Sequence, residues 1–107
     1  MKLIVLADRP INHSQNLNFN LFLDQVDLDF ETLAILKRGT NSKISINTLI
    51  KKKIFFENFN HPKSLIIFEN TIKSYKPDVI YILNFKVMHK YIDIAKNTKK
   101  DIRVVLD

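Results

Sequence analysis

The stretch KPDVIYILN, Lys76 to Asn84, decides the fold. The residue before a proline is driven out of the right-handed α region, so a helix arriving at Lys76 must end there. Val79 to Leu83 then form an uninterrupted apolar run, whereas a strand with one wet face would alternate apolar and polar residues. The stretch therefore predicts a helix followed by a parallel strand that is covered on both faces.

Other short apolar runs predict the remaining strands. LIVLA (Leu3 to Ala7) and IRVVL (Ile102 to Leu106) share the continuous pattern of a covered parallel strand, and ETLAIL (Glu31 to Leu36) reads as a strand with an exit turn at Lys37. The segment 44–56 is ambiguous. It predicts one further strand, near 44–49 or at Lys53 to Phe56.

Apolar residues at helical spacing predict three helices. One runs from Lys86 to about Thr98, because Met88, Tyr91, Ile92 and Ala95 share a face. A second ends at Lys76, with Asn60 or His61 near its cap and Pro62 in its first turn. A third is expected over about 15–27.

Together these elements predict an α/β fold in one Rossmann-like domain, 1–107. We expect an open parallel sheet of about five strands in the order 3-2-1-4-5, with helices on both faces and right-handed crossovers. In such sheets the ligand crevice lies at the carboxyl ends of the strands where the strand order reverses. That point falls between the first and fourth strands, at Asp8 to His13 and at Asn84 with Phe85.

Composition excludes several classes of protein. The 107 residues contain no cysteine, which removes disulfides and thiolate chemistry and favours a cytoplasmic location. No apolar run approaches the length of a transmembrane helix. A single glycine leaves no room for a dinucleotide or P-loop phosphate motif. The net charge of +6 attracts polyanions, but only three of the 17 basic residues are arginine and no basic helix is evident, so we expect no nucleic-acid partner.

The segment IKSYKPDVIYILNF…YIDIAKNTKKDIRVVLD resembles a recurring part of bacterial GT-B glycosyltransferases of the group 1 type. The resemblance covers Ile72 to Asp107 well and Met1 to Leu6 weakly. It implies the amino-terminal, acceptor-side domain of a larger enzyme for cell-surface polysaccharide or glycolipid synthesis. A missing carboxyl-terminal domain would bind the sugar-nucleotide donor, so this part would hold no cofactor and be inactive alone. Many members carry a glycine-rich turn after the first strand, and here that loop has no glycine.

Polar residues near the predicted crevice are the candidates for the site. Arg9 could pair with an anion or be a solvated loop residue. Asn84 could bind sugar hydroxyls or cap the following helix. Asn12 and Phe85 are further acceptor-binding candidates. For catalysis the candidates are His13, as a base or a helix cap, and Asp107, by resemblance only. His61 and His89 fit no metal-ligand spacing, so no metal is assigned.

Other partners and functions stay open at this point. Lys51 to Lys53 beside Phe55 and Phe56 could touch an anionic membrane surface at the inner face, although a solvated charge run is favoured. The rival to a glycosyltransferase is a small non-enzymatic α/β module for assembly or receiver-like signalling, with a dimer through an uncovered sheet edge. A receiver needs an acidic pair after the first strand, and only Asp8 is available there.

Overall fold

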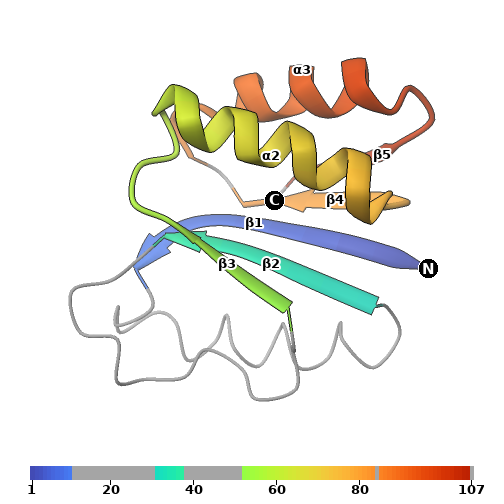
Figure 1. Cartoon of the computed structure of the whole chain (residues 1–107), viewed down its shortest axis with the longest axis horizontal. Coiled ribbons are helices and arrows are strands. Elements are labelled where there is room, and N and C mark those ends of the chain that lie inside the picture. Colours follow the sequence, from blue (N-terminus) through green and yellow to red (C-terminus); the bar gives the residue numbers. More distant parts are fainter. Residues whose placement is uncertain (11–30, 38–51, 84, 107) are drawn as a thin grey trace.

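A computed structural model describes residues 1–10, 31–37, 52–83 and 85–106. Its centre is a five-stranded sheet in which every neighbouring pair is parallel, in the order β3-β2-β1-β4-β5 (Figure 1). The predicted fold class and strand order are confirmed. The strands are β1 (Lys2–Pro10), β2 (Glu31–Lys37), β3 (Lys52–Phe56), β4 (Val79–Ile82) and β5 (Arg103–Leu106).

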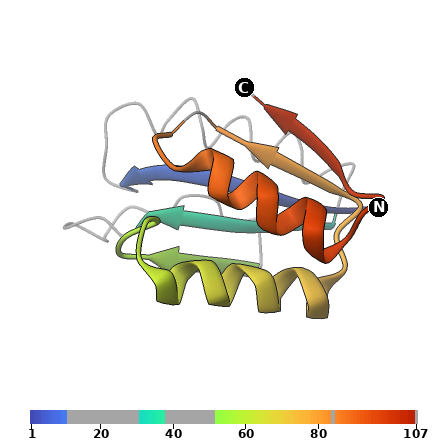
Figure 2. The same cartoon turned by 90° about the horizontal axis from the view of Figure 1, so that it is seen from above.

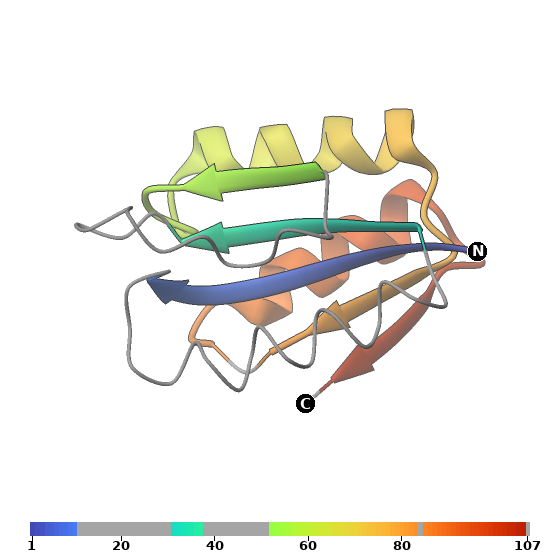
Figure 3. The same cartoon turned by 90° about the horizontal axis from the view of Figure 1, so that it is seen from below.

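Both described helices cover the same face of the sheet. They are α2 (Pro62–Tyr75) and α3 (Met88–Thr98), which lie side by side in Figures 1 and 2. Seen from the opposite side in Figure 3, they lie behind the five strands. The helix predicted over 15–27, which was to cover the other face, lies outside the described residues.

Alternation along the strands divides the core into two layers. In β1, Ile4 and Leu6 belong to the large cluster beneath α2 and α3, whereas Val5 and Ala7 belong to a smaller cluster on the other face. All four side chains are buried, because β1 has a strand on each side and apolar neighbours on each face. Such burial explains why its apolar pattern is continuous.

The strand β5 differs from its prediction. It lies at the edge of the sheet, paired only with β4, and Val105 and Leu106 expose 37% and 50% of their surface. The prediction of a strand buried on both faces is therefore wrong for β5. A continuous apolar run identifies a strand. Whether that strand is buried depends on its position in the sheet, which the run does not show.

The uncertain segment contains β3 at Lys52–Phe56, the second of the two predicted alternatives. Phe56 is buried in the large cluster and packs edge-on against Phe59 with ring centroids 5.2 Å apart. The residues 44–49 lie outside the described residues.

The Lys-Pro-Asp break acts largely as predicted. Lys76 leaves the right-handed helical region, although it takes the left-handed conformation (φ 55°, ψ 59°) rather than an extended one, and its N–H donates to the Ile72 carbonyl. Asp78 then anchors the strands at their amino ends, because its carboxylate accepts from the Lys2 N–H at 2.9 Å and its own N–H donates to the Lys2 carbonyl at 2.8 Å. This exchange helps to align β1 with β4.

Within the part of the chain that the structure describes, no helix has the length and apolar character needed to cross a membrane.

The left-handed cap gives a test of the fold. Replacing Lys76 with glycine removes the clash of a Cβ in that conformation, so we expect the free energy of unfolding to rise by about 1 kcal/mol. The matched control is Lys73→Gly, which puts glycine inside α2 at an exposed position and should cost about 1 kcal/mol. Urea unfolding measures both changes. Equal losses in the two variants would contradict the observed cap.

Candidate functional site

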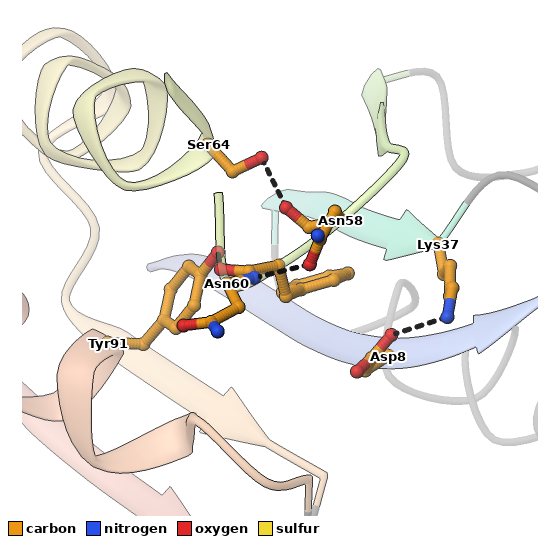
Figure 4. A network of polar contacts seen from close by, with 7 residues as sticks. Asp8, Lys37, Asn58, Asn60, Ser64 and Tyr91 are labelled. Atoms are coloured by element: carbon orange, nitrogen blue, oxygen red, sulfur yellow. Dashed lines mark hydrogen bonds and ion pairs between the residues drawn. The ribbon is translucent and has the colours of Figure 1, made fainter. Parts of the chain in front are cut away.

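The carboxyl edge of the sheet is where the buried faces of β1 and β2 become charged. On the face covered by α2 and α3, Ile4 and Leu6 are followed by Asp8, and Leu33 and Ile35 are followed by Lys37. Lys37 Nζ lies 3.8 Å from Asp8 Oδ1 (Figure 4). The same alternation that fills the core therefore delivers a carboxylate and an ammonium group to the edge.

The negative charge of the Asp8 carboxylate is only partly balanced by its neighbours. Its Oδ1 atom is buried and accepts no hydrogen bond from any described residue, and the 3.8 Å to Lys37 Nζ is too long for one. The Lys37 side chain is 41% exposed, so water screens the attraction between the two charges. A quarter of the Asp8 side chain remains exposed. The Asp8 side chain thus has one buried oxygen without a donor among the described residues and another part that faces solvent.

Tyr91 of α3 lies beneath this edge. Its side chain is fully buried and its hydroxyl donates to the Phe59 carbonyl at 2.7 Å. Burial raises the pKa of the Tyr91 hydroxyl well above its ordinary value of 10.0, and the negative charge of Asp8 raises it further. The phenol therefore stays protonated and serves as a hydrogen-bond donor.

Aromatic rings form the floor of the edge. Ring centroids of neighbouring members lie 4.9–5.6 Å apart in tilted or edge-on arrangements, which are the favoured geometries for aromatic pairs. We call this set the aromatic cluster: Phe56, Phe59, Phe68, Phe85 and Tyr91. It joins β3, the segment 57–61 and both helices, so the polar groups above it rest on a rigid base.

The segment 57–61, between β3 and α2, is tied down by hydrogen bonds (Figure 4). Ser64 Oγ donates to the Asn58 carbonyl at 2.8 Å, and the Asn58 side chain accepts from the Asn60 N–H at 2.9 Å. Lys90 Nζ of α3 donates to Asn60 Oδ1 at 2.8 Å. These bonds place amide and ammonium groups beside the ends of β1 and β3.

The start of α2 agrees with the sequence. His61 is its N-cap, as one of the two alternatives had it, and its Nδ1 accepts from the Lys63 N–H at 3.1 Å. The imidazole thus satisfies one of the backbone N–H groups that the first turn of a helix leaves without a partner. Its role here is structural.

The start of α3 does not agree. The helix begins at Met88 rather than Lys86, and its N-cap is Val87, with no capping hydrogen bond from a side chain. The interpretation of Asn84 as the helix cap is therefore wrong, because the cap position falls three residues further on. Asn84 itself lies outside the described residues, and its acceptor-binding role stays a prediction.

The other predicted site residues have different outcomes. Arg9 was expected after the end of the first strand, but β1 continues to Pro10, with an irregular register between Ala7 and Pro10. Phe85 lies at the predicted edge, where its half-buried ring packs against Phe59 and Tyr91. Asn12, His13 and Asp107 lie outside the described residues.

The described residues line two hollows near this edge. One, of about 520 Å³, lies between the end of β3 and the start of α2, with Phe55, Asn58 and Lys63 among its lining residues. The other, of about 470 Å³, is shallow and is lined by Phe85, Lys86, Met88 and His89. Among the described residues, no three His, Cys, Asp or Glu side chains gather as metal ligands would.

Sequence reasoning missed most of the polar framework. Tyr91 was predicted only as a core residue of its helix, and Lys37 only as part of a turn. The pair Asn58 and Asn60 follows directly after an apolar run, which is a usable signal for a strand end. That signal was not used because the strand before it was predicted only as one of two alternatives.

The buried Tyr91 hydroxyl can be tested through stability. Tyr91→Phe leaves the Phe59 carbonyl without its buried donor, so we expect a loss of about 1–2 kcal/mol at neutral pH. The folded protein keeps the phenol proton above pH 10, where the unfolded chain releases it, so wild-type stability falls by about 1.4 kcal/mol per pH unit from this group. Phenylalanine lacks this decline.

The difference in unfolding free energy between wild type and Tyr91→Phe should therefore narrow as pH rises above about 10. Urea unfolding of both proteins across that range measures it. A difference that stays constant would show that Tyr91 titrates normally in the folded state.

Comparison with known proteins adds no identification to this geometry. No protein-family model, curated protein or solved structure matches the chain. A functional conclusion therefore stands on the residues and on the arrangement described above.

Proposed function

We propose that this chain is the acceptor-side domain of a sugar-nucleotide-dependent glycosyltransferase, and that the acceptor binds at the carboxyl edge of the sheet. The resemblance of Ile72 to Asp107 to GT-B enzymes supports the class of enzyme. The fold is compatible with it, because those enzymes are built from Rossmann-like domains with parallel sheets. Fold alone does not assign a function, so the site must carry the rest.

The observation that carries the proposal is the set of groups at the reversal of strand order. There β1 pairs with β2 on one side and with β4 on the other, which is where open parallel sheets bind ligands. Asp8, Asn60 and Lys90 supply a carboxylate, an amide and an ammonium group at that edge, above the aromatic cluster. Hydroxyl-rich molecules need both acceptors and donors in this way.

In this proposal the donor sugar nucleotide is held by a second domain encoded beyond Asp107. The described residues supply the acceptor side alone. The acceptor is a sugar or a glycolipid head group, and the intact enzyme serves polysaccharide or glycolipid synthesis in the cytoplasm. An acceptor in a lipid would bring the domain to an anionic membrane surface. Phe56 takes no part in such a contact, since it is 3% exposed within the core.

One observation favours a second candidate, the assembly module. The edge strand β5 exposes Val105 and Leu106, and an unpaired strand edge is a template for pairing with another chain. In that case the functional surface would be β5 rather than the edge near Asp8. The two candidates therefore place ligand contacts on different parts of the molecule.

Transfer of sugar by the protein made from the complete coding sequence tests the proposal. We expect transfer from a nucleotide sugar to a carbohydrate acceptor in a panel of both. Lys90→Ala removes the ammonium group from this edge and leaves Asn60 Oδ1 without its donor. We expect the KM for the acceptor to rise about tenfold or more, the effect of losing one hydrogen bond to a charged group. Lys96→Ala, on the same helix and exposed, is the matched control and should leave KM unchanged.

A coding sequence without a second Rossmann-like domain past residue 107 would contradict this proposal. So would a lack of transfer with every donor, or a dimer whose dissociation follows Val105→Lys with no effect of sugars. The last result would favour the assembly module.

A further inference from the structure

We propose that the Asp8 carboxylate is the group that accepts a hydrogen bond from a hydroxyl of the bound sugar acceptor. This inference rests on the proposed function and names the residue that anchors the ligand. Asp8 would be a binding and specificity-determining residue.

The first support is the unsatisfied oxygen. Nearly all buried polar atoms in folded proteins have a hydrogen-bond partner. A polar atom that loses its water on burial and gains no partner costs the protein free energy. Asp8 Oδ1 is such an exception within the described residues. A carboxylate that is short of donors gains more from a new hydroxyl than a fully hydrated one does.

The second support is that neither Lys37 nor Tyr91 donates a hydrogen bond to Asp8 Oδ1. Lys37 Nζ stands 3.8 Å away, beyond hydrogen-bond distance. The Tyr91 hydroxyl, whose proton Asp8 helps to retain, donates to the Phe59 carbonyl instead. No described residue therefore donates to Asp8 Oδ1, and a quarter of the Asp8 side chain is exposed, so a ligand can approach the carboxylate from its exposed part.

The surroundings of Asp8 define the class of ligand. A divalent cation would need more carboxylate or imidazole ligands, and the described residues bring no three together. Lys37 repels an ammonium group on a ligand, and Asp8 repels a phosphate placed directly against it. A neutral hydroxyl group can donate to Asp8 without being repelled by Lys37. Sugars are rich in such groups.

A structural role for Asp8 makes the opposite prediction about stability. If Asp8 held the fold together through Lys37, its replacement would destabilise the protein. If it is a ligand anchor, the buried oxygen costs stability in the free protein, and removal of the charge leaves the unfolding free energy unchanged or higher.

The experiment compares sugar binding and stability in matched variants of the protein made from its complete coding sequence. The probes are the methyl glycosides of glucose, galactose, mannose and N-acetylglucosamine, titrated by NMR. We expect Asp8→Asn to weaken binding of the preferred glycoside by about tenfold or more, because the acceptor loses its charge. The control Asp93→Asn, an exposed carboxylate on α3, should bind as wild type does.

Monodeoxy forms of the preferred glycoside identify the hydroxyl. We expect one of them to bind wild type and Asp8→Ala equally weakly, since removing either partner breaks the same hydrogen bond. Urea unfolding of Asp8→Asn should show no loss of stability.

The outcomes separate this inference from the proposed function. Binding of a glycoside that is equal in wild type and Asp8→Asn would overturn the role of Asp8 and leave the acceptor site standing. Weaker binding together with lower stability would make Asp8 a structural residue and also overturn it. Absence of both glycoside binding and sugar transfer in the wild-type protein would overturn the two together.

Discussion

The structure depends on one constraint, the complete enclosure of β1. This strand pairs with β2 and β4 and has apolar layers on both faces, so Leu3 to Ala7 must all be apolar and buried. The other strands are arranged around it, with β2 and β3 on one side and β4 and β5 on the other. The enclosure ends at Asp8. A charged side chain two residues earlier, at Leu6, would be buried in the core at a high cost in free energy. At the edge of the sheet the cost is lower because part of the Asp8 side chain is exposed.

The aromatic cluster converts this edge into a fixed surface. Tyr91 contributes a ring that packs against Phe59, Phe68 and Phe85 and a hydroxyl that holds the Phe59 carbonyl. One side chain thus connects α3 to the segment between β3 and α2. Polar groups on that segment keep their positions because the rings below them cannot shift independently. A binding site gains affinity from this kind of pre-organisation, since less conformational freedom is lost when a ligand arrives.

In the role proposed for Asp8, stability and ligand binding make opposite demands on its carboxylate. The core beneath it is closely packed and its polar groups are largely paired, whereas Asp8 Oδ1 is buried without a donor. Polar groups without a hydrogen-bond partner are common at binding and catalytic sites, because the ligand supplies the missing hydrogen bond. Lys37 Nζ, 3.8 Å from Asp8 Oδ1, moderates the negative charge without removing it, while Lys90 Nζ donates to Asn60. The edge therefore carries donors and an acceptor together, which a surface with one sign of charge would not.

The sequence by itself determined the elements and their order. Periodicity located β1, β2, β4, α2 and α3 to within about three residues, because a buried face imposes its spacing on neighbouring residues in the chain. It could not decide between two positions for β3, because the apolar residues of the segment 44–56 fit both an alternating and a helical spacing. Only the tertiary structure decided that β5 is an exposed edge, that α3 is capped at Val87 and that Asp8 lacks a donor. Those properties depend on residues far apart in the chain, such as Asp8 with Lys37 and Tyr91, and a local pattern reports the face of an element but never its neighbours.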